Sequence, residues 1–409
     1  MITKINIKGF KSLKNAEVEF YTKKNIADKN KDVTRKHQLL NGGFAYTFNL
    51  AGLIGANATG KSSFLEAILI YKTIVLNHYF DINKPEFRFF FELEKKPKQF
   101  NFEYLIDDNV LKHEVNLNEN FQITCEKLSI LNKAKKDNSW SLIFQNNYKY
   151  SLLWRLNEIS QYEKDESFNL NSVQISLIKK LFEFIKHIVF FNNNLGIFEN
   201  NMLLPLLVQD LKYFFLNKNS ETQNRFDLIK DLISAVDPNI IDFEYDQLRD
   251  EIIVLVQEND KVVKVLLDNI SVGTKRFIFI MLPIILRKNE TNFYLIDEIE
   301  NSLHPTLIDT ILRLFYFNDT NLNNSQLFFT THNPYIFDQI ELHNSCINIS
   351  LYNSDENFAK LSNFNDYKRN DKLFSKNYIL EIINSHPESN NIYQIYENFS
   401  NKKDESNLM

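Results

Sequence analysis

Glycine is scarce in this chain. Its 409 residues contain only eight glycines and eight prolines. Glycine is needed where the backbone adopts a positive φ or lies against another group, so each remaining glycine marks a position where the backbone has few alternatives. Three of the eight glycines, Gly55, Gly60 and Gly273, fall in the motifs described below.

Other scarcities exclude whole classes of protein. The two cysteines, Cys125 and Cys346, are too few for a disulfide framework or a cysteine-rich zinc site. No run of about 18 apolar residues is free of charge, and the first residues are too polar for a signal peptide. We therefore expect a cytoplasmic protein without a membrane partner. The formal net charge of -5 gives no global positive field, although a local basic groove for nucleic acid stays open.

The composition is that of a globular protein, with 44% hydrophobic and 24% charged residues. A chain of this length forms about two or three domains or lobes. The pattern of strands, helices and motifs predicts an N-terminal lobe, a mainly helical insertion, a C-terminal lobe, and a C-terminal helix with a polar tail. The four parts are expected at residues 1–125, 126–238, 239–372 and 373–409.

Continuous apolar segments alternate with helical patterns in both lobes. The segment at 293–296 is wholly apolar, those at 47–54 and 326–331 have continuous apolar stretches, and each lies ahead of a helical stretch. Strands of this kind are buried on both faces, which predicts an α/β fold with a mostly parallel core sheet. Further short β-like segments predict an antiparallel β subdomain beside this core, at about 87–93, 100–106, 110–117 and 121–125.

Residues 55–62 match the pattern G-x-x-x-x-G-K-[ST], between an expected strand and an expected helix. The glycines let such a loop wrap tightly, so that backbone N–H groups and the helix N-terminus face phosphate oxygens. Lys61 would reach the β- and γ-phosphates, and the Ser62 hydroxyl would bind magnesium. The alternative is a chance glycine turn. The context favours an ATP site formed by Gly55, Asn57, Ala58, Thr59, Gly60, Lys61, Ser62 and Ser63.

The apolar segment 293–296 ends in two acidic residues, Asp297 and Glu298. This arrangement is a Walker B pattern, in which the first carboxylate holds magnesium and the second positions or deprotonates the attacking water. The alternative is a carboxylate that caps the next helix. Because a P-loop lies upstream, we favour the Walker B interpretation and predict that the protein uses ATP and Mg²⁺.

A third motif, Ser271-Val272-Gly273-Thr274-Lys275-Arg276, stands directly before a helical stretch. An ordinary helix cap would explain a serine here. The S-x-G-x-[KR] pattern shortly before Walker B also resembles the signature motif of ABC-type ATPases, which binds the γ-phosphate of ATP held by the opposite subunit. The resemblance therefore assigns Ser271, Gly273 and Thr274 to the ATP site of a partner copy.

The segment Thr330-Thr331-His332-Asn333-Pro334 follows the next strand. A lone histidine is more often structural than catalytic. At this strand end, His332 resembles the switch histidine of ABC-type ATPases, which contacts the γ-phosphate. The segment 301–305 occupies the place of the D-loop in the same superfamily, and the alternative for it is a plain strand-to-helix turn.

The Leu303-His304-Pro305 variant is typical of one branch, the prokaryotic "AAA family" of predicted ATPases associated with phage defence and abortive infection. Their heads resemble those of SMC proteins and OLD-family nucleases. Phe10-Lys11-Ser12 and Gly273-Thr274-Lys275-Arg276 also resemble segments of that branch. The resemblance covers about 1–125 and 240–372 and implies an ABC-type P-loop ATPase head whose catalytic residues are Lys61, Glu298 and His332.

The resemblance also implies a function. Two heads would sandwich ATP, so the chain would form a homodimer or a higher oligomer of dimers, and hydrolysis would open the pair. We expect the sensor or motor subunit of an anti-phage system, acting with a separate effector protein such as a nuclease or toxin. An SMC-like DNA-repair or DNA-binding ATPase is the alternative, and a scaffold that binds ATP but barely hydrolyses it also stays open.

Two elements of the family pattern have no firm counterpart. Gln99 lies in about the right region for the Q-loop, but a surface glutamine is the simpler interpretation. Arg369 and Asp371 resemble an R-x-D element, yet the glycine-containing tail that usually follows it is missing. No acidic cluster typical of a TOPRIM nuclease follows the ATPase motifs, so we do not expect a fused nuclease.

Overall fold

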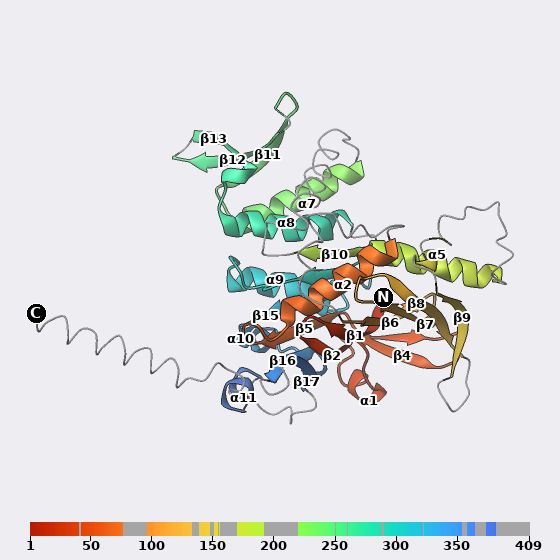
Figure 1. Ribbon diagram of the computed structural model, residues 1–409. Helices are drawn as coiled ribbons and strands as arrows, with labels where there is room; N and C mark the ends of the chain where they lie inside the picture. The colour runs from red at the N-terminus through yellow and green to blue at the C-terminus, as the bar shows by residue number, and fades with distance from the viewer. Residues whose placement is uncertain are drawn as a thin grey trace, which may run out of the picture.

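The computed structural model describes 14 segments of the chain, and the account below is confined to them. They are residues 1–40, 42–76, 96–132, 139–147, 151–153, 155, 170–191, 220–249, 251–259, 261–287, 290–321, 323–353, 358–364 and 374–381. Their centre is one twelve-stranded sheet with helices on its faces, and a smaller sheet stands apart from it beyond α7 and α8 (Figure 1).

One half of the large sheet is parallel. Its five strands are hydrogen-bonded in the order β10 (Ile188–Phe191), β14 (Phe293–Ile296), β15 (Gln326–Thr331), β5 (Leu50–Gly55) and β16 (Ile347–Asn353). The residues of β5, β14 and β15 are all buried, as the continuous apolar segments predicted. Strands that are buried on both faces need a layer of helices on each side.

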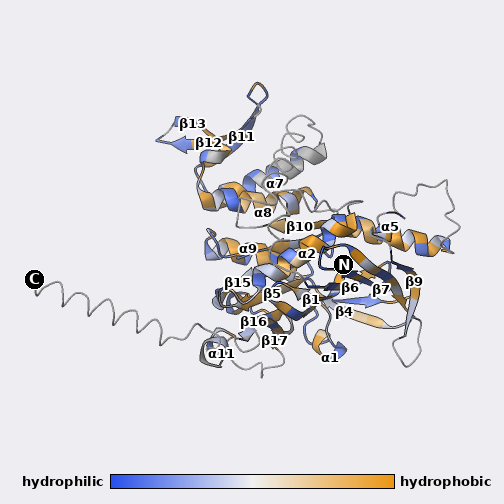
Figure 2. Ribbon diagram, viewed as in Figure 1, coloured by the Kyte–Doolittle hydropathy of each residue, from blue (hydrophilic) through white to orange (hydrophobic). Residues whose placement is uncertain are grey.

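The two faces of the parallel half belong to two separate cores. In β14, Leu295 packs into the core beneath α2 (Lys61–Leu76) and α5 (Ser172–Lys186), whereas Ile296 packs into the opposite core. The second core contains the apolar sides of α8 (Val272–Leu286), α9 (Pro305–Tyr316) and α10 (Tyr335–Gln339). Figure 2 shows the hydrophobic residues along α2 and α8. This alternation explains why β14 is apolar at every position.

The other half of the sheet is mainly antiparallel and continues from β16 without a break. One pair, β17 with β2, is parallel. The predicted α/β fold with a mostly parallel core and an antiparallel part is confirmed, and the two parts share one sheet. The predicted segment at 87–93 lies outside the described residues. The strands, in order from β16, are β17 (Phe358–Asn363), β2 (Leu13–Glu19), β1 (Ile2–Phe10), β6 (Lys98–Ile106), β7 (Asn109–Leu117), β8 (Ile123–Leu131) and β9 (Trp140–Asn146).

A three-stranded antiparallel sheet leads into the motif at 271–276. It consists of β11 (Ile240–Asp246), β12 (Glu251–Glu258) and β13 (Lys261–Leu266), and it packs near α7 (Ser220–Val236) and α8. None of the described helices is both long and apolar enough to cross a membrane. The remaining elements are α1 (Lys24–Ala27), the hairpin of β3 (Thr34–Gln38) and β4 (Phe44–Phe48), the short 3-10 helices Leu267–Asn269 and Asn344–Cys346, and α11 (Phe374–Glu381).

The structure differs in detail from the predicted domain boundaries. β8 crosses the boundary expected between residues 125 and 126, because the hairpin partner of β7 continues to Leu131. The stretch expected to be mainly helical also contains β9 and β10, together with α5 and α7. β10 lies at the edge of the parallel half, so the middle of the sequence contributes a strand to the parallel core. The division of the chain into domains itself stays a prediction.

A buried polar network joins α2 to the antiparallel half. The Tyr104 hydroxyl donates to Tyr71 at 2.8 Å, and the Tyr71 hydroxyl lies 2.6 Å from Nδ1 of His113. Nε2 of His113 lies 2.9 Å from Oε1 of Glu126, and both side chains are fully buried. The Ser151 hydroxyl also donates to Glu126, at 2.8 Å. Buried polar groups are tolerated when each has a partner, so this chain of contacts fixes the position of α2.

Candidate functional site

Three of the predicted motifs meet at one edge of the sheet. β5, β15 and β14 are neighbouring parallel strands, so their carboxyl ends lie side by side. β5 leads into the P-loop, β14 leads into Asp297 and Glu298, and β15 leads into His332. Ligands of open α/β sheets bind at the carboxyl ends of the strands. The topology therefore brings together residues that the sequence separates by more than 200 positions.

The P-loop needs its glycines for two different reasons. A Cβ at Gly55 would lie 2.5 Å from the Ser350 carbonyl oxygen of β16, which is closer than real Cβ atoms approach. Gly60 has a φ of +93°, a conformation that other residues rarely adopt. The loop is further fixed by the Ser350 hydroxyl, which donates to the Thr59 carbonyl at 2.5 Å. Ser12, in the Phe10-Lys11-Ser12 segment, lies against Gly60 on the other side.

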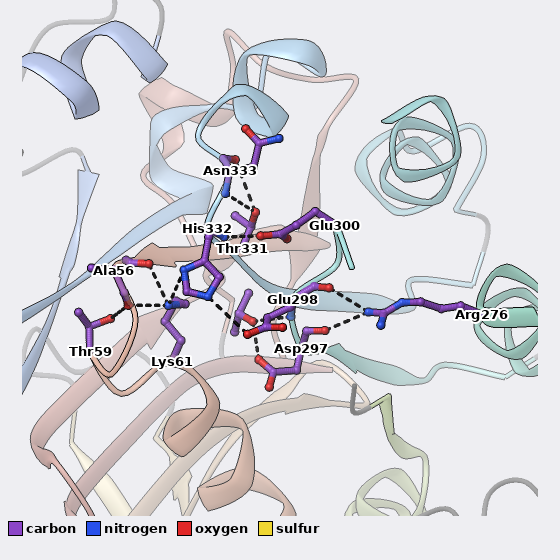
Figure 3. Close-up of polar contacts among 12 residues, drawn as sticks. Ala56, Thr59, Lys61, Arg276, Asp297, Glu298, Glu300, Thr331, His332 and Asn333 are labelled. Atoms are coloured by element: carbon purple, nitrogen blue, oxygen red, sulfur yellow. Dashed lines mark hydrogen bonds and ion pairs between the residues drawn. The ribbon is translucent and has the colours of Figure 1, made fainter. Parts of the chain in front are cut away.

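Lys61 is buried, and its ammonium group has three close partners. Nζ donates to the carbonyl oxygens of Gly55 at 2.8 Å and Ala56 at 2.7 Å. It also lies 3.3 Å from Nδ1 of His332 (Figure 3). Burial lowers the pKa of Lys61 to about 8, although Asp297 and Glu298 act in the opposite direction. Phosphate oxygens in this loop would replace the two carbonyls and favour the charged ammonium.

The other P-loop residues differ in how far they are exposed to solvent. Asn57, Ala58 and Ser62 are exposed, and Ser63 is half-buried. Thr59 is buried, and its hydroxyl donates to the Ala56 carbonyl at 2.9 Å, so it shapes the loop. Ser62 and Ser63 stand in the first turn of α2, where backbone N–H groups have no partner within the helix. The exposed Ser62 and the backbone N–H groups of this first turn can therefore face an anion.

The Walker B turn is fixed by a threonine. Asp297 is buried, and its Oδ1 accepts a hydrogen bond from the Thr330 hydroxyl at 2.5 Å. The same hydroxyl accepts the backbone N–H of Glu298 at 2.8 Å. Glu298 has a φ of 45°, and a non-glycine residue in the left-handed region costs about 1–2 kcal/mol. Thr330 was not among the predicted site residues; its place two residues before His332 was the available signal.

Arg276 fixes the same turn from the other side. Its Nη2 donates to the carbonyl oxygens of Asp297 at 3.1 Å and Glu298 at 2.9 Å (Figure 3). Burial lowers the pKa of this guanidinium to about 10, and Glu300, Glu298 and Asp297 counteract the burial. α8, which begins at the signature-like motif, is therefore tied to the Walker B turn of its own chain.

His332 lies between the P-loop lysine and the Walker B glutamate. Its Nδ1 is 3.3 Å from Nζ of Lys61, and its Nε2 is 3.4 Å from Oε1 of Glu298. The tautomer with the proton on Nε2 satisfies both contacts, because Nδ1 then accepts and Nε2 donates. The backbone N–H of His332 donates to Oε1 of Glu300 at 2.5 Å. The structure thus brings Lys61, Asp297, Glu298 and His332 together, as Figure 3 shows.

The signature-like residues form a helix start of their own. Ser271 is the N-cap of α8, and its Oγ accepts the Thr274 N–H at 3.1 Å and lies 2.7 Å from the Thr274 hydroxyl. In the described residues these side-chain bonds are local and do not reach the P-loop. A Cβ at Gly273 would lie 2.6 Å from the Ser302 carbonyl, so this glycine lets α8 lie against the expected D-loop.

The residues at the edge suit a magnesium ion that is shared with a nucleotide. Asp297 offers a carboxylate and Ser62 a hydroxyl, the oxygen donors that Mg²⁺ prefers when phosphates and water complete its shell. No group of three or more His, Cys, Asp or Glu side chains that could enclose a metal occurs among the described residues. The donor set therefore fits a nucleotide-bound ion better than a closed protein cage.

Two elements of the family pattern are not assigned to the site. Gln99 lies within β6, between Lys8 of β1 and Asn116 of β7, so the structure places it in a strand of the antiparallel half. The position of the Q-loop stays open. Arg369 and Asp371 lie outside the described residues.

Comparisons with known proteins identify the central part of the chain. The family model described as "AAA domain, putative AbiEii toxin, Type IV TA system" matches residues 50–338. These residues include the signature-like motif and the three motifs that meet at the edge of the sheet. Among solved structures, the chain is similar to the SMC head domain from Thermotoga maritima, at 14% identity and a TM-score of 0.41, over 88% of this chain and 98% of that chain. No curated protein matches it.

Proposed function

The chain belongs to the AAA-domain family whose model spans residues 50–338, and from this premise we propose that it is a magnesium-dependent ATP hydrolase acting as a molecular switch. The observation that carries the proposal is the position of the His332 ring, between Lys61 at 3.3 Å and Glu298 at 3.4 Å. This arrangement links a phosphate-binding cation to a carboxylate that is suited to act as a general base.

We propose the following roles for the residues of the site. The P-loop N–H groups and Lys61 bind the β- and γ-phosphates. Ser62 and Asp297 would hold Mg²⁺, which neutralises phosphate charge when bound. Glu298 orients a water molecule and accepts its proton as the water oxygen attacks the γ-phosphorus. The bond to the bridging oxygen breaks, and ADP leaves with inorganic phosphate as the second product.

We further propose that a second copy of the chain completes each site. Ser271 and Gly273 lie at the start of α8, whose Arg276 contacts the Walker B turn of the same chain. A γ-phosphate bound at this helix start would come from a partner copy, and its loss on hydrolysis would remove the contact. A ligand that binds one arrangement better than the other is what a two-state switch requires.

The biological setting is also a proposal. The family description names a putative AbiEii toxin and a type IV toxin–antitoxin system. On this basis we propose that the ATPase serves an anti-phage or toxin–antitoxin system in the cytoplasm and acts with a separate effector protein. Purification of the tagged chain from its native host, followed by mass spectrometry, identifies a partner that is retained with ATP and lost with ADP.

Replacing Lys61 by alanine is expected to weaken ATP binding roughly 10- to 150-fold, the range for losing a charged hydrogen bond. The measurement is calorimetric titration with ATP and magnesium. Lys180→Ala is the matched control, because Lys180 of α5 forms an exposed ion pair with Asp107, which lies in the turn between β6 and β7. Unchanged affinity in Lys61→Ala would remove the P-loop from the ATP site.

A mixing experiment tests the shared site. Lys61→Ala and Ser271→Arg are each expected to be inactive alone, because each variant damages both composite sites of its homodimer. A one-to-one mixture is expected to recover about a quarter of the wild-type rate, since half of the dimers are mixed and each holds one intact site. A mixture that stays as inactive as Lys61→Ala alone contradicts the shared site.

A further inference from the structure

The backbone of His332 is held by a carboxylate that the motifs did not assign to catalysis. Oε1 of Glu300 accepts the His332 N–H at 2.5 Å, and the two residues are 32 positions apart in sequence. Figure 3 shows Glu300 reaching from the Walker B turn toward the start of the His332 loop. A hydrogen bond to an ionised acceptor is roughly twice as strong as a neutral one, so this contact ties the two loops together.

The bond to Glu300 holds the backbone of His332, whereas the other two contacts are made by its ring. The ring lies 3.3 Å from Nζ of Lys61 and 3.4 Å from Oε1 of Glu298. Both ring contacts are long for hydrogen bonds, so the ring depends on its backbone for its position. Without the bond to Glu300, the loop would be free to rotate the ring away from the phosphate side.

Glu300 is itself placed by a rigid turn. The Ile299 N–H donates to the Thr330 carbonyl at 3.0 Å, and the Asn301 N–H donates to the Glu298 carbonyl at 2.9 Å. The turn is thus hydrogen-bonded to Thr330 of β15, two residues before His332. Any shift of the Walker B turn therefore moves the acceptor of the His332 N–H.

Of the two carboxylate oxygens of Glu300, only Oε1 accepts a hydrogen bond within the part of the chain that the structure describes. Oε2 is buried there without a hydrogen-bond partner, although the carboxylate also acts electrostatically on Arg276. The bond from the His332 N–H is therefore the one directional contact that the described residues give this carboxylate in the turn that bears Glu298.

We propose that Glu300 is a positioning residue for ATP hydrolysis and that it acts through His332. It holds the histidine backbone so that the ring spans Lys61 and Glu298 when the γ-phosphate is transferred. This inference rests on the proposed ATPase function and adds a residue to it. A displacement of about 1 Å at such a position is enough to lower a rate about 100-fold.

The first test is a double-mutant cycle on the rate of ATP hydrolysis. Glu300→Ala is expected to lower kcat about 10- to 100-fold with KM nearly unchanged, because ATP still binds the P-loop. In a His332→Ala background, the same change is expected to lower kcat less than about threefold, since residues that act as a unit are not additive. Full additivity of the two losses overturns the inference.

Glu300→Gln tests whether the loss of activity in Glu300→Ala comes from the lost hydrogen bond or from a folding defect. The glutamine side chain keeps an oxygen for the His332 N–H, so its kcat is expected to stay within about threefold of the wild type. Asp246→Ala is the matched control, because Asp246 also accepts backbone N–H groups, in the remote β11–β12 turn. A loss in Asp246→Ala as large as that in Glu300→Ala would show that the effect is structural.

The second test does not depend on hydrolysis. Hydrogen exchange of the His332 amide, followed by mass spectrometry without nucleotide, is expected to become about tenfold faster in Glu300→Ala and to change little in Glu300→Gln. Unchanged exchange overturns the positioning role. If exchange responds but the wild type hydrolyses no ATP, the contact is real and the proposed ATPase function fails.

Discussion

Replacing Glu298 by glutamine is expected to lower the rate of ATP hydrolysis about 100-fold or more, the usual contribution of a general base. The amide keeps the size of the side chain and its position 3.4 Å from Nε2 of His332, but it cannot accept a proton from water. ATP affinity is expected to stay within about threefold, because the P-loop is unaltered. Steady-state kinetics and calorimetric titration with ATP measure the two quantities.

The same variant reports on association. If hydrolysis opens the pair, Glu298→Gln with magnesium and ATP is expected to double in mass, while the wild type returns to its starting mass as ATP is consumed. Light scattering after size exclusion measures the mass. Glu183→Gln is the matched control, since Glu183 pairs with Lys186 on the exposed side of α5. Turnover equal to the wild type in Glu298→Gln would remove Glu298 from the catalytic role.

Glu126→Ala is expected to lower the free energy of unfolding by about 3–5 kcal/mol, the cost of removing one partner from a buried, hydrogen-bonded carboxylate–histidine pair. The substitution leaves His113 without its partner and removes the acceptor of the Leu152 N–H, which lies 2.5 Å from Oε2. Urea denaturation measures the change. Glu114→Ala on the adjacent strand, whose pair with Lys112 is partly exposed, is expected to cost about 1 kcal/mol or less. Equal losses in the two variants would contradict the role of the network.

The buried carboxylate also gives the stability a pH dependence. Burial acts to raise the pKa of Glu126, but the hydrogen bonds from His113, Leu152 and Ser151 prevail and lower it below the ordinary value. The unfolded chain therefore takes up this proton first as the pH falls. The stabilisation is fully present above the ordinary pKa of glutamate, about 4.3, and is lost as the pH falls through the lowered value. Glu126→Gln is expected to lack this part of the acid sensitivity.

The sequence by itself determined the parts of the protein that depend on neighbouring residues. The strand at 293–296 is apolar at every position and is buried on both faces, and such strands alternating with helical patterns predicted a parallel core. The spacing of Gly55, Gly60 and Lys61 predicted the turn between β5 and α2. The sequence motifs and their resemblance to ABC-type ATPases also named Lys61, Glu298 and His332, which the fold brings together at one edge of the sheet.

The tertiary structure decided which side chains hold this edge in place. Arg276 reaches carbonyl groups 21 and 22 positions away, and Glu300 reaches an amide 32 positions away. Such partners are backbone groups, which are identical in nearly every residue, so no residue pattern identifies them. Glu126 lies within β8, and its charge alone would predict a side chain that faces solvent. Its hydrogen-bond partners nevertheless include His113 of β7 and residues 151 and 152. Burial of a charge depends on what the fold brings over it, and that is fixed only when distant segments pack together.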